Sequence, residues 1–504
     1  MRAGGGPVAL VILDGWGVGP ETPHNAITAA RPTTFQRLWD HYPHALLAAS
    51  GPAVGLPAGT CGNSEVGHLT LGAGRIIRQP LSRIDDLIEG GILCDQPVLS
   101  QQFSRLAHEH GALHLIGLVS EGKVHSDQQQ LHALIHCAAK SGIERVFVHA
   151  ILDGRDTPAQ SAATYLEQLE AYCATAKIGT IASLCGRFYA MDRDGQWDRT
   201  CAAFRLYTEA PKVQEQHWRQ VLAQYYKDGV TDEFIPPTSL HAAAFIRPED
   251  GILLFNVRPD RMRQLTALLL GRELTTGRGK TSPPCGARVP YRFLISAVRY
   301  ASNFNNPVLL EPEEVDDTLL DHLQTAGLRI FTIAETEKYA HVTYFFSGGR
   351  EAVRPDETRV MIPSLGIRDY AAHPCMSAPT ITERVVAALR ADTADFYLIN
   401  YANADMVGHT GNFEATVAAV SCVDKQLHTL FEELVQKRGA SLFIVGDHGN
   451  AEEKWDAVAG RPRTAHTSNP VPFIAVNVEN ALPPMRGLSD VAAVVEENMA
   501  IQRR

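Results

Sequence analysis

Short apolar runs recur along the chain, and each run is followed directly by a loop that contains Asp, His, Arg or Gly. Helix-type periodicity separates one run from the next. This alternation predicts an α/β fold with predominantly parallel sheets. Because ligands of such sheets bind beyond the carboxyl ends of the strands, the residues that follow each run are the first candidates for a functional role.

Acidic and imidazole side chains accompany the apolar runs at the two ends of the sequence. VALVIL at 8–13 leads into an aspartate, while FYLINY at 396–401 and SLFIVG at 441–446 each lead into an aspartate and a histidine. A further histidine precedes VPFIAV at 471–476. The set is Asp14, Asp405, His409, Asp447, His448 and His466. Each member alone could belong to a turn or a helix cap, but together they favour a metal centre.

The number and type of these side chains indicate how many metal ions are bound and which metals are suitable. Three aspartates and three histidines exceed the needs of one catalytic ion, which typically has three protein ligands and one open position. The count favours two ions about 3.5 to 4 Å apart that clamp a phosphoryl group. Oxygen and imidazole ligands without thiolate favour Mn²⁺ or Zn²⁺ over copper or iron–sulfur clusters, and Mg²⁺ is less suited to histidine.

One serine lies in an unusually glycine-rich stretch. AGTCGNSEVGHLTLGAGR at 58–75 surrounds Ser64 with five glycines. A metal centre can activate a serine hydroxyl as a nucleophile, and glycines let backbone amides approach a phosphate closely. The alternative is a simple turn and helix N-cap. Cys61 is a rival nucleophile, ranked lower because a thiolate beside such metals would be captured as a ligand.

The middle of the sequence carries a second set, dominated by arginine. It follows the apolar runs of LHLIGLV, RVFVHAIL, TIASLCG and GILLFNV, and consists of His125, Arg155, Asp156, Arg187, Arg193, Arg258 and Arg261. Guanidinium groups bind carboxylate and phosphate bidentately, so several of them favour a substrate that carries both groups. Taken singly, each arginine could instead form a surface salt bridge.

The separation of the two sets predicts one domain interrupted by another. We expect a discontinuous metal-binding domain formed by 1–78 and 309–504, and an inserted substrate-binding domain at 79–308. The crossings are expected near 75–85 and 300–314, where polar, proline-containing sequence begins. The length of 504 residues agrees with more than one hydrophobic core.

Composition excludes several classes of protein. The 45% hydrophobic and 20% charged residues are ordinary for a globular enzyme. A net charge of −10 argues against nucleic acid or an anionic membrane as the main partner. No apolar run has the length of a membrane span, and the opening MRAGGGPVALVILDGWG is expected to form a buried strand without a signal peptide.

The cysteines give an expectation about the compartment. They number nine, are scattered, and never show C-x-x-C spacing: Cys61, Cys94, Cys137, Cys173, Cys185, Cys201, Cys285, Cys375 and Cys422. This pattern fits a reducing cytoplasm and predicts neither a disulfide framework nor a structural zinc site.

Nine motifs carry a resemblance to a known family. LDGWG, NSEVGHLTLGAGR, DGRDTP, GRFYAMDRD, NVRPDR, AETEKYAHVTYFFSGG, NYANADMVGHTG, DHGNAE and AHTSNPVPF resemble the cofactor-independent phosphoglycerate mutases of the alkaline phosphatase superfamily, in the family's order from about residue 8 to 476. The resemblance implies an alkaline-phosphatase-like α/β domain interrupted by a second α/β domain, and interconversion of 3-phosphoglycerate and 2-phosphoglycerate in glycolysis through a phosphoserine.

Roles for individual residues follow from the same resemblance. One ion would be held by Asp405, His409 and His466, and the other by Asp14, Ser64, Asp447 and His448. Matching substrate positions are His125, Arg155, Asp156, Arg187, Arg193, Arg258, Arg261 and Lys338. Ser64, Asp156 and Lys338 would be catalytic, with Asp156 as acid and base on the glycerate hydroxyls. The resemblance implies a cytoplasmic monomer with two Mn²⁺ ions, or alternatively Zn²⁺, Co²⁺ or Mg²⁺, and no bisphosphoglycerate.

The sequence departs from the family pattern at a few positions. Gly446 and Ser347 replace an alanine and an asparagine, and IRDYAAHPCMSAP at 367–379 is a loose version of a family stretch. None of these changes touches a matched ligand. Two other functions stay open at this point: a phosphomonoesterase, sulfatase or sugar-phosphate mutase of the same superfamily, and a protein that binds metal and anion without turnover.

Overall fold

The computed structural model describes residues 6–211, 215–276, 279–281, 285, 289–311, 313, 315–367, 369–457, 460–478 and 480–501. The chain divides into two compact units, Met1–Gln79 with Glu314–Arg504 (unit 1) and Pro80–Glu313 (unit 2). The sequence placed the boundaries at 78/79 and 308/309. Within the expected crossing at 300–314, residues 312 and 314 lie outside the described residues, as does residue 368 of the divergent stretch.

Unit 1 is built on a mostly parallel sheet. Among the described residues its strand order is β12 (Glu357–Ile362), β11 (Ile330–Glu335), β13 (Phe396–Tyr401), β1 (Val8–Leu13), β14 (Ser441–Gly446), β17 (Val471–Val476) and β2 (His44–Leu47). The first five strands are parallel, and β17 and β2 pair antiparallel. The expected α/β architecture with a predominantly parallel sheet is therefore confirmed.

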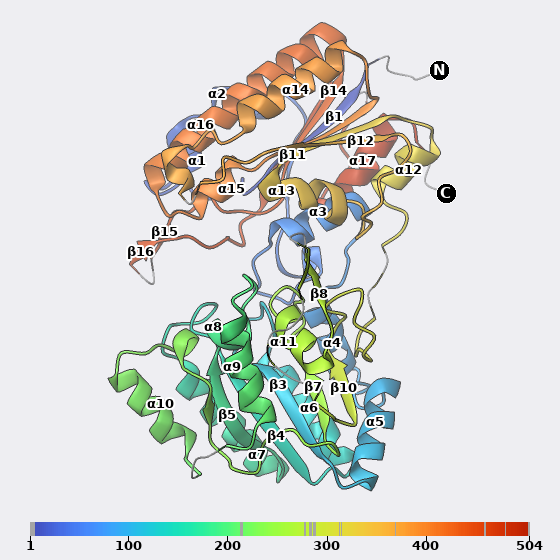
Figure 1. Ribbon diagram of the computed structural model, residues 1–504. Helices are drawn as coiled ribbons and strands as arrows, with labels where there is room; N and C mark the ends of the chain where they lie inside the picture. Colours follow the sequence, from blue (N-terminus) through green and yellow to red (C-terminus); the bar gives the residue numbers. More distant parts are fainter. Residues whose placement is uncertain are drawn as a thin grey trace. The chain divides into compact units, whose positions relative to one another are not determined.

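Helices cover both faces of this sheet (Figure 1). The described helices are α1 (Ala26–Ala30), α2 (Thr33–His41), α3 (Ser64–Ala73), α12 (Leu319–Thr325), α13 (Thr336–Ala340), α14 (Ala378–Arg390), α15 (Asn403–Gly408), α16 (Phe413–Leu430) and α17 (Val491–Asn498). Strand β1 has both faces buried: Ala9, Val11 and Leu13 pack with α2, α14 and α16, whereas the alternate residues pack with α3, α12 and α17. Burial on both faces explains the unbroken apolar run at 8–13.

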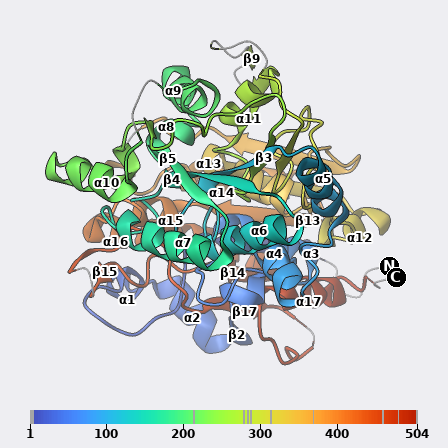
Figure 2. The ribbon, with the colours of Figure 1, turned by 90° about the horizontal axis from the view of Figure 1, so that it is seen from below.

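Unit 2 has its own sheet and core. Its described strand order is β10 (Phe293–Ser296), β7 (Gly251–Leu254), β3 (Ala112–Leu118), β4 (Arg145–Leu152), β5 (Thr180–Gly186) and β6 (Thr238–Ser239), parallel except for β6. The helices are α4 (Pro80–Glu89), α5 (Pro97–His108), α6 (Gln128–Lys140), α7 (Ala162–Ala176), α8 (Arg187–Ala190), α9 (Trp197–Thr208), α10 (Trp218–Lys227) and α11 (Arg263–Leu270). Helices α6 and α7 lie side by side (Figure 2).

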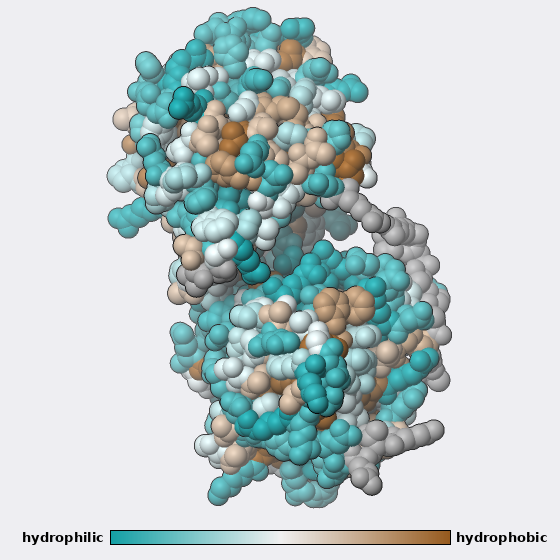
Figure 3. Space-filling view, turned by 90° about the vertical axis from the view of Figure 1, so that its left-hand side faces the viewer, coloured by the Kyte–Doolittle hydropathy of each residue, from teal (hydrophilic) through white to brown (hydrophobic). Residues whose placement is uncertain are grey.

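The described residues also form two small two-stranded ribbons: β8 (Leu274–Thr276) pairs with β9 (Gly279–Thr281), and β15 (Trp455–Asp456) pairs with β16 (Arg461–Pro462). The face in Figure 3 is mainly hydrophilic with scattered hydrophobic patches, since most large apolar side chains lie in the two cores. Among the described helices, none combines the length and hydropathy needed to cross a bilayer.

Three cysteine pairs in the described part of the chain are bonded as disulfides, Cys94–Cys137, Cys201–Cys285 and Cys375–Cys422. The expectation that the cysteines form no disulfide framework is therefore wrong. The paired residues are 43, 84 and 47 positions apart. Their approach is created by tertiary packing, which neither the odd count nor the absence of C-x-x-C spacing reveals.

The disulfides predict a thiol count. Cys61, Cys173 and Cys185 are the free cysteines of the described chain, so alkylation of denatured, unreduced protein should label three thiols, and alkylation after reduction should label nine. Cys422→Ser should lower the free energy of unfolding by about 2–4 kcal/mol, the usual contribution of a native disulfide. Mass spectrometry and denaturant titration measure the two effects. Nine labelled thiols without reduction would contradict the pairing.

Candidate active site

The carboxyl ends of four neighbouring strands bring the first set of predicted residues together. Strands β11, β13, β1 and β14 are adjacent and parallel, so they end at one edge of the sheet of unit 1. Asp14 directly follows β1 and Asp447 directly follows β14, while Asp405 lies in α15 just beyond β13. Lys338 lies in α13, which begins where β11 ends. The topology of the sheet thus brings residues that are far apart in the sequence into one cluster.

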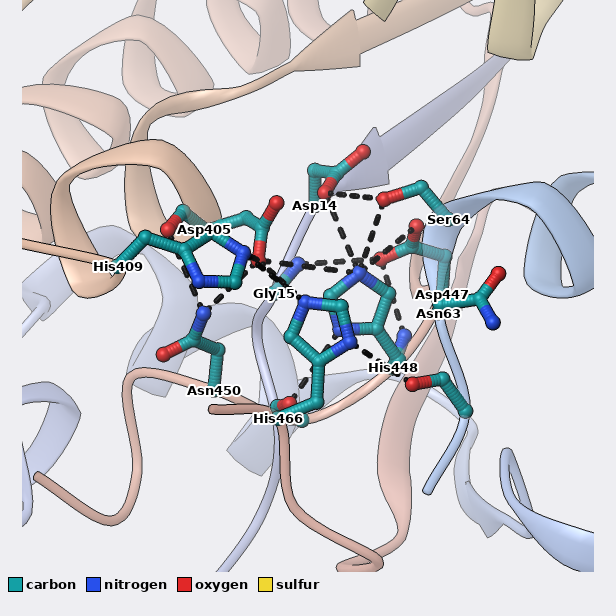
Figure 4. Close-up of polar contacts among 12 residues, drawn as sticks. Asp14, Gly15, Asn63, Ser64, Asp405, His409, Asp447, His448, Asn450 and His466 are labelled. Atoms are coloured by element: carbon teal, nitrogen blue, oxygen red, sulfur yellow. Dashed lines mark hydrogen bonds and ion pairs between the residues drawn. The ribbon is translucent and has the colours of Figure 1, made fainter. Parts of the chain in front are cut away.

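Ser64 joins this cluster as the first residue of α3. The side chain of Asn63 caps the helix by accepting a hydrogen bond from Val66 N at 3.2 Å. The Ser64 hydroxyl is buried, lies 3.0 Å from His448 Nε2 and donates to Asp14 Oδ1 at 3.1 Å (Figure 4). Lys338 Nζ donates to Ser64 Oγ at 2.6 Å. The hydroxyl therefore lies among an acid, an imidazole and a cation.

Asp405, His409 and His466 converge on one point. Nε2 of His409 lies 3.2 Å from Asp405 Oδ1, Nε2 of His466 lies 3.1 Å from the same oxygen, and the two ring nitrogens are 3.1 Å apart. Nδ1 of His409 donates to Thr464 O at 2.7 Å, and Nδ1 of His466 to Gly62 O at 2.9 Å. These bonds fix both rings and leave each Nε2 able to bind a proton or a metal ion.

Asp14, Asp447 and His448 form a second group of possible ligands, with ligand atoms within 4.8 Å of one another. His448 also belongs to a group with Asp405 and His466 by the same measure, so its ring lies at the junction of the two sets. All three members of the second group are fully buried. Asp447 Oδ2 has no hydrogen-bond partner among the described residues.

This donor set fits divalent cations. Several carboxylate and imidazole acceptors face one another, and backbone carbonyls orient the rings. The buried Asp447 Oδ2 forms no hydrogen bond to any described residue, although His68 Nδ1 lies 3.3 Å away. Oxygen and nitrogen ligands of this kind suit Mn²⁺ or Zn²⁺. Cys61, the rival nucleophile, instead contacts Ser468 Oγ at 3.3 Å.

The electrostatics of the cluster rest on Lys338, which is 4% exposed. Its Nζ donates at 2.6 Å to Asp14 Oδ1 and to Asp405 Oδ2. Although burial opposes its charge, these two carboxylates raise the pKa of Lys338 above its ordinary range. The ammonium in turn keeps the pKa of Asp14 and of Asp405 below the usual range despite their burial. Lys338 was also predicted to bind substrate, and the structure places it with the first set.

The histidine pKa values respond to the same carboxylates. Burial opposes the charged ring of His448, but Asp447 and Asp405 raise its pKa to about 10. The side chain of His409 is 42% exposed, and although partial desolvation opposes its charged form, the Asp405 carboxylate raises its pKa. Burial and the neighbouring His448 lower the pKa of His466. At neutral pH the His448 ring therefore carries a proton when no metal ion is bound.

Several residues that sequence reasoning missed hold these ligands in place. Asn450 Nδ2 donates to Asp405 Oδ1 at 2.8 Å, and Asn400 Nδ2 donates to Asp14 Oδ2 at 2.9 Å. Asn400 is a fully buried polar residue within β13, so a polar position inside an apolar run was the available signal. Gly15 has φ +73°, and a Cβ there would lie 2.6 to 2.7 Å from Asp405 atoms, which explains the glycine of LDG.

The second predicted set gathers at the carboxyl edge of the sheet of unit 2, where β7, β3, β4 and β5 are adjacent and parallel. Arg187 is buried and donates through Nη1 to Asp156 Oδ2 at 2.5 Å. Its Nη2 lies 3.0 Å from His125 Nε2. Burial and the cation of Arg187 hold the pKa of His125 well below its usual range, so the ring is neutral.

The other four arginines follow the same strands. Arg193 Nη1 donates to Asp260 Oδ2 at 2.8 Å, and Arg258 Nε lies 3.3 Å from Asp260 Oδ1. Arg155 Nη1 donates to Glu233 Oε1 at 3.3 Å, and Arg261 Nη1 donates to Met191 O at 3.2 Å. Burial and the cations of Arg193, Arg187 and Arg155 lower the pKa of Arg261. Mutual repulsion of this kind favours binding of an anion.

Two family models match the chain. Residues 84–287 match the model described as BPG-independent PGAM N-terminus. Residues 305–494 match the model described as type I phosphodiesterase / nucleotide pyrophosphatase. The first match lies within unit 2, and the second covers most of the C-terminal part of unit 1.

Curated proteins and a solved structure extend the match to the whole chain. The 2,3-bisphosphoglycerate-independent phosphoglycerate mutase of Synechococcus sp. (strain JA-3-3Ab) is 45% identical over 95% of this chain and 89% of the relative. That of Moorella thermoacetica is 44% identical over 99% and 96%. A crystal structure of Leishmania mexicana phosphoglycerate mutase at low cobalt concentration has TM-score 0.77 and 30% identity over 100% and 96%. The chain therefore belongs to the family of 2,3-bisphosphoglycerate-independent phosphoglycerate mutases.

Proposed function

We propose that the protein, as a cofactor-independent mutase, interconverts 3-phosphoglycerate and 2-phosphoglycerate through a phosphoserine on Ser64. The observation that supports this proposal is the Ser64 hydroxyl, buried within 2.6 to 3.1 Å of Lys338, His448 and Asp14. A lone serine hydroxyl is a poor nucleophile at neutral pH, and such neighbours stabilise its alkoxide. The phosphoryl group must then return to the other hydroxyl of the glycerate, so the enzyme must hold the glycerate in place.

Two Mn²⁺ ions are the proposed cofactors, with Zn²⁺, Co²⁺ or Mg²⁺ as alternatives. Asp405, His409 and His466 would hold one ion, and Asp14, Ser64, Asp447 and His448 the other. When bound, divalent ions supply positive charge that activates a hydroxyl and stabilises a transferring phosphoryl group. His448, which lies close to both groups of carboxylates, links the two sets.

The residues of unit 2 are proposed to hold the glycerate while Ser64 carries the phosphoryl group. The forked donors of Arg155, Arg193, Arg258 and Arg261 suit the carboxylate and phosphate of the substrate. Asp156 would give a proton to the glycerate oxygen as its bond to phosphorus breaks. It would take a proton from the other glycerate hydroxyl as that oxygen attacks the phosphoserine. His125 and Arg187 contact each other beside Asp156 and would complete this pocket.

The main alternative is a hydrolase that uses the same nucleophile. It would need no second set of arginines to hold a dephosphorylated acid, so the unit 2 cluster favours the mutase. A monomer in the cytoplasm stays a prediction, which size-exclusion chromatography with light scattering and cell fractionation can test.

Ser64→Ala should abolish isomerisation while metal binding stays largely intact, because the hydroxyl is one ligand of several but the proposed carrier of phosphate. The measurement is coupled conversion of 3-phosphoglycerate with Mn²⁺ and no bisphosphoglycerate, together with recovery of phosphoserine from the native enzyme. Cys61→Ala, three positions earlier, is the matched control and should stay active. Substantial activity in Ser64→Ala would show that another residue is the nucleophile.

Metal binding should release protons. With a pKa of about 10 in the metal-free cluster, His448 is protonated at pH 7 and must lose that proton to bind an ion. The affinity for Mn²⁺ should therefore fall as the pH is lowered, about tenfold per unit for each proton released. Calorimetric titration in two buffers of different ionisation enthalpy counts the protons. A flat affinity between about pH 6 and 8 would argue against histidine ligation.

Arg193→Ala should loosen the substrate carboxylate and let water compete for the phosphoryl group. We expect isomerisation to fall by at least about tenfold, with more inorganic phosphate released per isomer formed, because positioning keeps the acceptor ahead of water. Both products are followed in one reaction. Arg219→Ala, an exposed arginine of α10 paired with Glu167, is the control. Equal loss of both products would favour the hydrolase.

A further inference from the structure

Asp153 directly follows β4 in unit 2, and both oxygens of its buried carboxylate accept hydrogen bonds. Its side chain is 2% exposed. Oδ1 accepts from Arg187 Nη1 at 2.7 Å, from Asp156 N at 2.9 Å and from Arg155 N at 3.2 Å. Oδ2 accepts from the Ser120 hydroxyl at 2.7 Å. Three of the four donors thus belong to residues that sequence analysis selected as substrate-binding, whereas Asp153 itself was not selected.

The four donors fix the carboxylate from two sides. Ser120, fully buried beyond β3, holds one oxygen, and the turn after β4 folds back onto the other. Gly154 in that turn has φ +66°, and a Cβ there would lie 2.8 Å from Glu233 N and 2.9 Å from Asp232 Cβ. The turn therefore packs closely against the 232–233 segment, with little freedom to shift.

Arg187 links the fixed Asp153 carboxylate to Asp156 and His125. Its Nη1 is shared between Asp153 and Asp156, and its Nη2 contacts His125. A buried guanidinium needs a fixed counter-charge. Asp156 is 20% exposed, whereas Asp153 is fully enclosed, so Asp153 is the fixed partner and Asp156 is the one that substrate can reach.

We propose that Asp153, oriented by Ser120, is a positioning residue that sets the places of Arg187 and Asp156 for the reaction. The inference rests on the proposed function, in which these two residues handle the glycerate. Asp153 touches no substrate in this scheme. The two neighbouring carboxylates thus have different tasks. Asp153 balances the charge of Arg187, which leaves Asp156 available for proton transfer.

The test is Asp153→Asn, which keeps a side-chain acceptor for the backbone amides but removes the charge opposite Arg187. We expect kcat to fall about tenfold to a hundredfold, because a misplacement of about 1 Å can cost about a hundredfold in rate. The ratio of inorganic phosphate to isomer should rise. Ser120→Ala removes only the orienting bond and should shift both quantities in the same direction, by about threefold to tenfold.

Asp250→Asn is the matched control. Asp250 is also buried and accepts from Ala112 N at 2.8 Å and Arg247 N at 3.0 Å. It precedes β7, so it lies at the opposite edge of the same parallel sheet from the cluster. We expect Asp250→Asn to lower thermal stability while the phosphate-to-isomer ratio stays that of the native enzyme.

The product ratio is independent of how much protein is folded, so it separates positioning from stability. A native ratio in both Asp153→Asn and Ser120→Ala would overturn the proposal. If Asp153→Asn does not fold, the phosphate-to-isomer ratio of Ser120→Ala alone tests the proposal: a raised ratio supports it, and a native ratio overturns it. The native enzyme is assayed in parallel. If the native enzyme does not isomerise phosphoglycerate, the proposed function is rejected. If the native enzyme is active and both variants keep its product ratio, only the role of Asp153 is rejected.

Discussion

The buried negative charge at one edge of the sheet in unit 1 is the constraint on which the site depends. Asp14, Asp405 and Asp447 are each at most 2% exposed, and carboxylates so deeply buried require compensating positive charge. Lys338 and the protonated imidazole of His448 provide it in the metal-free cluster. Divalent cations would meet the same demand, since a cation and a proton compete for the same carboxylate and imidazole atoms.

Unit 2 presents the complementary charge, because its strand ends collect guanidinium groups. Several of these arginines are paired with carboxylates of their own unit, including Asp260 and Glu233. These ion pairs hold the arginines in place, and in the proposed function the anionic groups of the substrate would replace the paired carboxylates. In the proposed scheme the two units divide the chemistry: unit 1 supplies the nucleophile and the metal ligands, and unit 2 holds the anionic acceptor.

The sequence predicted the parallel sheets and the strand-end residues well, because both follow from local patterns. The runs leading to Asp14 and Asp447 are continuous apolar strands, and the rule that ligands lie beyond carboxyl ends needs no tertiary detail. The supporting residues were harder to predict. Asn400 contacts Asp14, and Asp153 contacts Ser120 and Arg187, partners that lie far away in the sequence. The contact between Cys375 and Cys422 depends on how a loop packs against α16.

The central position of β1 has a consequence for biosynthesis. Its neighbours in the sheet are β13 and β14, and β14 ends roughly 430 residues after β1. At a translation rate of about 5–20 residues per second, the apolar strand waits roughly 20 to 90 s for its second partner. All of unit 2 is synthesised within that interval and can fold first as a unit. While unit 2 is synthesised, VALVIL therefore lacks both of its native sheet neighbours, and a segment in that state is apolar enough to attract a chaperone.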